Sequence, residues 1–187
     1  MSEKIPRIYI EACPIIDMAQ EKSQGLSGNR LSAGVWVCQQ ALRAGRDRKA
    51  KILTSFLSIA ECTRVNIDAA TQPTSPPEDI KRFFEMLLLS GKSGMELIPI
   101  TQAIAIRARN LRWVSDINLR GADTIHVASA LQLQCNELWT RDGRIWNNRA
   151  KLAELGLSVV RPSETRFLPS EYQILSLFAD ENSEATS

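Results

Sequence analysis

The sequence predicts an α/β fold in which a parallel central sheet of four to five strands is flanked by helices on both faces, giving three layers. Short apolar runs alternate along the 187 residues with longer segments in which apolar residues recur at helical spacing. Several of the short runs lack polar alternation, which is typical of strands buried on both faces. We expect one domain over residues 1–162 and an extension over residues 163–187, because the pattern weakens beyond Pro162.

The first half of the chain contains two predicted strands and three predicted helices. In order, these are a strand over residues 8–10, a short helix that opens at Pro14, a loop over residues 20–29, a helix over residues 30–46, a strand over residues 51–57 and a helix from Ser58 to about Asp68. Pro14 suits the first turn of a helix, where its missing N–H would have no partner. Gly45 and the basic residues beside it indicate the end of the second helix.

The second half supplies the remaining strands and the helices between them. In order, these are a helix that opens at Pro77, a strand over residues 96–100, a helix from Thr101 to Trp113, a helix over residues 121–133, a strand over residues 138–140, a helix over residues 147–155 and a strand over residues 157–160. Pro99 favours an outer position in the sheet for its strand, because proline donates no ladder hydrogen bond. In the extension we expect a short helix over residues 171–178 and a disordered tail over residues 180–187.

Composition excludes several classes of protein. The net charge of +2 is too small to indicate a nucleic-acid partner, so any basic surface must be local. Four scattered cysteines and one histidine argue against a zinc site made of thiolates and imidazoles. Glu11 and Asp17 argue against a signal peptide, and the longest apolar run, residues 86–89, is too short to span a bilayer. We therefore expect a soluble cytoplasmic protein that keeps its thiols reduced and has no membrane partner.

Four acidic residues are predicted to meet at one edge of the sheet. Glu11 and Asp142 follow predicted strands, Glu61 follows the second strand, and Asp123 lies in the first turn of the helix that begins at Gly121. Carboxylates crowded in a partly desolvated cleft repel one another, so protons or cations must join them. Ligands that are all oxygen point to Mg²⁺ or Mn²⁺, ions that deprotonate a water and stabilise charge on a phosphodiester.

Three of these acids also have simpler structural interpretations. Asp123 could instead be an acid that the helix dipole favours. Glu61 has the capping-box spacing from Ser58, which suits a structural role as well as a catalytic one. Asp142 precedes Gly143, and Asp-Gly is a common turn pair.

The other polar residues near this edge leave alternatives open. Arg141 and Arg144 flank the predicted cleft and are candidates for holding a substrate phosphate, although Arg141 could instead pair with an acid. Asp17 is most simply a solvated helix residue. His126 is more simply a packed core residue than a metal ligand, because it lies inside a helix predicted to be largely buried.

The acids belong to an ordered set of motifs that resembles the PIN-domain nucleases over residues 8–160. The motifs are Ile-Tyr-Ile-Glu11, Ser58-Ile-Ala-Glu61, Asp123-Thr-Ile-His-Val-Ala-Ser-Ala130 and Trp139-Thr-Arg-Asp142. The last two, in this order and closely spaced, are the most specific part. The resemblance implies a PIN-like three-layer fold and a cluster of acids that binds Mg²⁺ or Mn²⁺.

The resemblance also implies an activity and a role for each residue. Many bacterial members are ribonucleases, often the toxins of toxin–antitoxin pairs, which implies RNA as the substrate and an antitoxin peptide or a second copy of the chain as partners. By resemblance, the metal ligands are Glu11, Asp123 and Asp142. Glu61 would be a further ligand or a water-orienting base. Thr140 lies beside the ions by resemblance, and we assign it to the substrate phosphate with Arg141 and Arg144.

The first motif departs from the family pattern. The family usually has Asp followed two residues later by Asn or Ser, whereas this chain has Glu11 and Cys13. Glutamate reaches one methylene further than aspartate, which would displace the first ligand by about an ångström. The alternative to a metal-dependent ribonuclease is therefore a catalytically degenerate PIN-like module that binds RNA or a protein partner.

Overall fold

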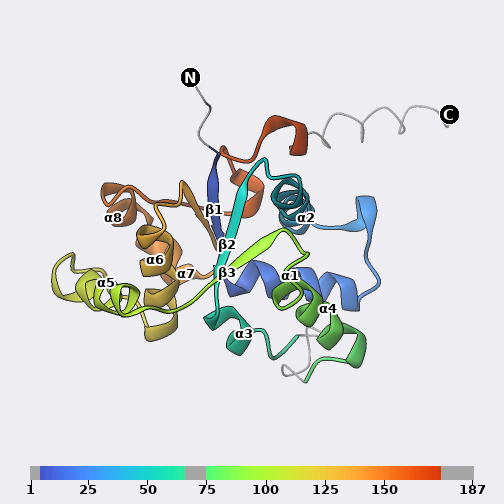
Figure 1. The fold of residues 1–187 in the computed structure, drawn as a ribbon, viewed down its shortest axis with the longest axis horizontal. Helices are drawn as coiled ribbons and strands as arrows, with labels where there is room; N and C mark the ends of the chain where they lie inside the picture. Colours follow the sequence, from blue (N-terminus) through green and yellow to red (C-terminus); the bar gives the residue numbers. More distant parts are fainter. Residues whose placement is uncertain (1–4, 66–74, 174–187) are drawn as a thin grey trace.

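A five-stranded parallel sheet forms the centre of the computed structural model, which describes residues 5–65 and 75–173. The strands are β1 (Arg7–Ile10), β2 (Lys51–Ser55), β3 (Met95–Ile98), β4 (Glu137–Trp139) and β5 (Ser158–Val160). Their order is β3-β2-β1-β4-β5, and all four pairings are parallel (Figure 1). The predicted parallel sheet is confirmed, and β3 lies at an edge, as Pro99 just beyond it predicts.

Helices cover both faces of this sheet (Figure 1). One face carries α1 (Ala12–Ser23), α2 (Ala33–Arg46) and α4 (Glu78–Leu88), and the other carries α5 (Gln102–Trp113), α6 (Gly121–Gln132), α7 (Gly143–Asn147) and α8 (Arg149–Glu154). Successive residues of a strand point to opposite faces, so Ile8 and Ile10 pack with the first group and Tyr9 packs with the second. In the ranges 5–65 and 75–173, no helix has the length and apolar character needed to cross a bilayer.

Side-chain caps set the starts of two predicted helices. Thr101 accepts a hydrogen bond from the Ile104 N–H at 3.3 Å, which confirms it as the cap of α5. Ser32 caps α2 in the same way, accepting from the Val35 N–H at 3.3 Å. The helix predicted from Arg30 therefore begins three residues later, at Ala33.

The predicted loop over residues 20–29 is wrong in its first part, because α1 continues to Ser23. Gln20, Glu21 and Lys22 are good helix formers that extend α1, although they contribute no apolar periodicity. Only residues 28–30 form a further short turn, of 3₁₀ type. Absence of apolar spacing therefore does not indicate a loop when the residues have high helix propensity.

Other element boundaries also differ from the prediction. The strand predicted over residues 51–57 ends at Ser55, and α3 is a short helix over Leu57–Glu61. The helix predicted over residues 147–155 is observed as α8, Arg149–Glu154, and it is preceded by a separate helix, α7, that begins after the Asp142 cap. Of the helix predicted at 171–178, the structure describes a 3₁₀ turn at Ser170–Tyr172; residues 66–74 and the tail at 180–187 lie outside the described residues.

The segment after β5 is attached to the sheet by the buried carboxylate of Glu137. Glu137 is 1% exposed and accepts hydrogen bonds from the Trp139 indole at 2.8 Å, the Thr165 hydroxyl at 2.6 Å and the Arg166 N–H at 2.9 Å. Further along, Leu168 is buried against the core on the α1, α2 and α4 face. These contacts join residues 165–168 to the same core as the sheet.

The end of α2 lies directly against the turn that precedes β3. A Cβ atom added at Gly45 would lie 2.0 Å from the carbonyl oxygen of Gly94, and one added at Gly94 would lie 2.1 Å from the carbonyl oxygen of Leu42. Gly94 also has a φ of 89°, which favours glycine. Gly45 therefore permits the backbone of α2 to lie against the turn before β3. Its position near the end of the helix had suggested only that it ends the helix.

Candidate functional site

Glu11 and Asp142 are linked through Thr140 at the carboxyl edge of the sheet. Glu11 follows β1 and is 4% exposed, and Thr140 follows β4 and is fully buried. The Thr140 hydroxyl donates to Glu11 Oε1 at 3.0 Å and accepts from the Asp142 N–H at 2.9 Å. The adjacent parallel strands β1 and β4 bring these three residues together, as the sequence predicts for the carboxyl ends of neighbouring strands.

Asp142 caps α7 with one of its carboxylate oxygens. Its Oδ1 accepts from the N–H groups of Arg144 at 2.7 Å and Ile145 at 3.3 Å. Its Oδ2 contacts the Arg144 guanidinium at 3.0 Å. Asp142 therefore has a local structural role, as its simpler interpretation proposed. One carboxylate oxygen caps α7, and the other contacts the Arg144 guanidinium.

Asp123 lies in the first turn of α6, but it is not the cap of that helix, which begins after Arg120. The residue is 8% exposed, and within the described ranges its buried Oδ2 has no hydrogen-bond partner. The nearest cation is Arg144, whose Nε lies 2.9 Å from this oxygen without a hydrogen directed at it. Burial, and then the nearby Asp142 carboxylate, raise the pKa of Asp123. A role as a cation ligand therefore explains this environment of Asp123 better than a role as a helix-start acid alone.

Glu61 is held by the single histidine of the chain. His126 Nε2 lies 2.6 Å from Glu61 Oε2, and His126 Nδ1 lies 2.8 Å from the Tyr9 hydroxyl. The two ring nitrogens of His126 thus have different polar partners, a carboxylate oxygen on one side and a hydroxyl on the other. Glu61 ends α3, and the Ser58 hydroxyl pairs with Thr54 at 2.7 Å, so the predicted capping box is wrong.

His126 is the residue of this edge that sequence reasoning did not assign to the site. It is 1% exposed, so its predicted burial is confirmed, yet both of its ring nitrogens have polar partners. The available signal was its position three residues after Asp123, which places both on one side of α6. The partners Tyr9 and Glu61 are too distant in sequence for spacing to identify them.

The two arginines at this edge have acidic partners. Arg141 forms an ion pair with Asp17 at 2.8 Å, which confirms the alternative that it pairs with an acid. Asp17 is partly buried, so the prediction of a solvated residue is wrong, and burial raises its pKa. Arg144 lies between Asp123 and Asp142 and contacts both. The predicted flanking positions are thus occupied by arginines already engaged with carboxylates.

The donor set at this edge fits a hard cation. In the described ranges, no three His, Cys, Asp or Glu side chains lie close enough together to hold a metal ion as they stand. The donors are nevertheless all oxygen, and the buried Oδ2 of Asp123 has no hydrogen-bond partner in the same ranges. Since the Arg144 guanidinium contacts both Asp123 and Asp142, a cationic group already lies where an ion would neutralise them.

Burial of Glu11 predicts a pH-dependent stability. Burial raises the pKa of Glu11 from its ordinary 4.5, so the folded chain binds this proton more tightly than the unfolded chain does. The free energy of unfolding should therefore fall as the pH rises from 4.5 through the raised pKa of Glu11. Urea unfolding in EDTA, from about pH 5 to pH 8, measures this slope.

The Glu11→Gln variant should have a flatter slope, because its amide does not titrate in this range. Glu85→Gln, at an exposed position of α4, is the control and should keep the slope of the unaltered chain. Equal slopes for Glu11→Gln and the unaltered protein would contradict this assignment.

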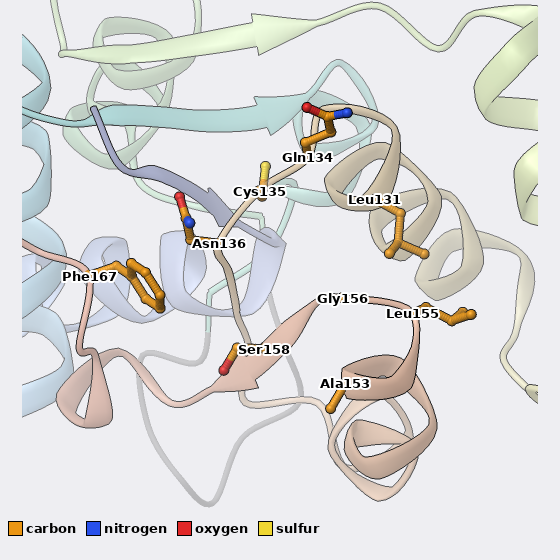
Figure 2. A pocket seen from close by; sticks show the side chains of 9 residues that line it. All are labelled: Leu131, Gln134, Cys135, Asn136, Ala153, Leu155, Gly156, Ser158 and Phe167. Carbon is orange, nitrogen blue, oxygen red and sulfur yellow. The ribbon is translucent and has the colours of Figure 1, made fainter. Parts of the chain in front are cut away.

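A separate pocket lies at the opposite, amino-terminal edge of the sheet (Figure 2). Its volume is about 500 Å³, and its lining includes Asn136, just before β4, and Ser158, at the start of β5. Phe167 and Leu155 also line it, and within residues 5–65 and 75–173 no charged residue lines it. The acids follow the strands rather than precede them, so this pocket is not part of the acidic edge.

Comparisons with known proteins bear on the family of this chain. The model of the PIN domain matches residues 38–152, a range that includes Glu61, Asp123 and Asp142 but not Glu11. A comparison with curated proteins finds no match. A chain of the solved structure of FitAB bound to an IR36 DNA fragment is similar at 15% identity with a TM-score of 0.49, over 85% of this chain and 97% of that chain. Because the family model covers more than half of the sequence, the chain belongs to the PIN-domain family.

Proposed function

We propose that the protein is a divalent-metal-dependent endoribonuclease that hydrolyses phosphodiester bonds of RNA at its acidic edge. The observation that supports this most is Asp123, a buried carboxylate beside Asp142 whose Oδ2 has no hydrogen-bond partner in the described ranges. Membership of the PIN-domain family supports a nuclease, and Mg²⁺ and Mn²⁺ are the ions that all-oxygen ligands favour.

In this proposal Glu11, Asp123 and Asp142 hold the ion. Thr140 is fully buried, so the prediction that it contacts the substrate phosphate is wrong; its hydroxyl instead links Glu11 to the backbone of Asp142. A bound ion would supply an activated water and would stabilise charge on the phosphodiester. Glu61 is positioned by His126 to orient the attacking water or to add a ligand. Arg141 and Arg144, both exposed in part, provide the cations for the substrate phosphate.

The decisive experiment compares cleavage of single-stranded RNA by the unaltered protein and by aspartate variants in millimolar Mn²⁺. Asp123→Asn and Asp142→Asn should each lower the cleavage rate at least about a hundredfold, because each removes a charged ligand. Folding should be retained in both variants, because the change is nearly isosteric and asparagine at position 142 can still cap α7.

The control for this experiment is Asp116→Asn, which alters an exposed aspartate that pairs with Arg112 and Lys151 rather than with a residue of the acidic edge. It should cleave RNA at the rate of the unaltered protein. Undiminished cleavage by both Asp123→Asn and Asp142→Asn would exclude the proposed site.

A second candidate is a degenerate module that binds RNA or a protein without cleaving, and Glu11 and Cys13 favour it. Burial raises the pKa of the Cys13 thiol, so this side chain does not supply a thiolate in place of the usual Asn or Ser. RNA binding without cleavage, together with no rise in melting temperature in Mn²⁺, would support this candidate. Cleavage gained by Glu11→Asp would show that the longer side chain impairs the site.

The proposed function also implies a protein partner. The family includes toxins of toxin–antitoxin pairs, so we propose an antitoxin peptide or a second copy of the chain as a binding partner. Coexpression with the product of a neighbouring small open reading frame, followed by copurification and a cleavage assay, tests this directly. A copurifying peptide that suppresses cleavage is the expected result.

A further inference from the structure

We propose that Arg144 is an internal counter-ion of the Asp123–Asp142 pair and competes with the divalent ion for these two carboxylates. This inference rests on the proposed function, since it concerns the same acids. It adds a role for a residue of this chain: metal binding requires that the Arg144 guanidinium leave the pair.

The contacts of Arg144 place its charge where an ion would have to neutralise the acids. Nε lies 2.9 Å from Asp123 Oδ2 and Nη2 lies 3.0 Å from Asp142 Oδ2. One guanidinium therefore contacts both carboxylates, and it does so through the oxygens that are free to bind an ion. Asp142 Oδ1 is already used by the backbone N–H groups of Arg144 and Ile145.

The side chain of Arg144 can leave without disturbing the fold. It is 46% exposed, and its contact with Asp123 has no hydrogen aligned on the oxygen. The backbone N–H of Arg144 would remain on Asp142 Oδ1, so the cap of α7 does not depend on the guanidinium. When the side chain swings out, it gives up the hydrogen bond from Nη2 to Asp142 Oδ2 and the contact of Nε with Asp123 Oδ2.

Electrostatics makes the two occupants mutually exclusive. Asp123 and Asp142 carry two negative charges when ionised, and the guanidinium contacts the Oδ2 atom of each, which are the oxygens that the ion would bind. A guanidinium that stayed in contact with them would lie beside the ion and repel it strongly in this partly buried place. The displaced guanidinium would then be at the rim of the site, where a substrate phosphate can accept its hydrogen bonds. Metal and substrate binding should therefore favour each other.

The test measures Mn²⁺ binding by isothermal titration calorimetry, without RNA, for the unaltered protein and for Arg144→Gln. Removal of the competing cation should tighten Mn²⁺ binding at least tenfold and should enlarge the rise in melting temperature that Mn²⁺ causes. Arg144→Lys keeps a charge but not the fork that spans two carboxylates, so its affinity should lie between the two.

Arg149→Gln is the matched control. It removes the same charge from the neighbouring helix α8, where Arg149 stacks over Trp146 rather than contacting an acid. Its affinity for Mn²⁺ should equal that of the unaltered protein. A gain equal to that of Arg144→Gln would mean that net charge alone sets the affinity, which overturns the inference.

Other outcomes separate this inference from the proposed function. Unchanged or weaker Mn²⁺ binding by Arg144→Gln, with clear binding by the unaltered protein, overturns the competition and leaves the metal-dependent nuclease standing. Failure of both proteins to bind millimolar Mn²⁺ overturns both proposals.

Discussion

Replacing Gly45 with alanine should lower the free energy of unfolding by at least about 4 kcal/mol, beyond the usual overpacking cost of about 1–3 kcal/mol. The new Cβ would lie 2.0 Å from the Gly94 carbonyl oxygen and 2.9 Å from its carbonyl carbon. These are backbone atoms of the turn before β3, so no side chain can rotate away to make room. The helix or the turn must shift, and with it the contact between α2 and the edge strand of the sheet.

Gly34→Ala is the matched control, because Gly34 lies in the same helix and a Cβ there meets nothing within 4 Å. This variant should be as stable as the unaltered protein or more stable by up to about 1 kcal/mol, since alanine has the higher helix propensity. Urea unfolding of both variants measures the difference. Similar stabilities for the two variants would show that the close contact between Gly45 and Gly94 is not maintained in solution.

Replacing Glu137 with alanine should lower the free energy of unfolding by about 4 kcal/mol, because hydrogen bonds to a charged group contribute about 1.5–3 kcal/mol each. Three donors lose their acceptor together: the Trp139 indole, the Thr165 hydroxyl and the Arg166 N–H. Part of the loss is offset, because the buried charge no longer needs to be desolvated. The segment after β5 should also become sensitive to limited proteolysis.

Two further substitutions separate the role of this carboxylate from the general effect of losing a glutamate. Glu96→Ala, at an exposed position of β3, should change stability by no more than about 0.5 kcal/mol. Glu137→Gln keeps one acceptor oxygen and should fall between the alanine variant and the unaltered protein. A Glu137→Ala variant as stable as Glu96→Ala would contradict the assigned hydrogen bonds.

The sheet and the gathering of acids at its carboxyl edge could be predicted because both follow from local patterns and one topological rule. Apolar runs identified the strands, and parallel strands end at a common edge, so Glu11 and Asp142 could be brought together from sequence alone. Thr140 joins the two because it follows the strand next to that of Glu11. This part of the site required no knowledge of side-chain packing.

Local sequence patterns could not predict the contacts between residues that are far apart in the sequence. Glu61 has the spacing of a capping residue, but its carboxylate binds His126, 65 positions away in the sequence. Gly45 has the position of a helix-ending glycine, but the backbone of Gly94 explains it better. In both cases a plausible local interpretation competed with a tertiary contact that spacing does not encode.

The place of Arg144 depended on an element boundary. A helix predicted from residue 147 leaves Arg144 in a loop, whereas the observed α7 begins at Gly143 and directs the arginine toward Asp123. The position of Arg144 two residues after Asp142 indicated a cation near the cleft, and the cap by Asp142 decided which acids it contacts.

The chain's single imidazole belongs to His126, beside Glu61 at the acidic edge. In a proton NMR spectrum, every histidine ring signal therefore has one origin, and no assignment by mutation is needed. The protein thus contains its own spectroscopic probe of this edge, and ions, RNA fragments or peptides can be screened on material with no added label.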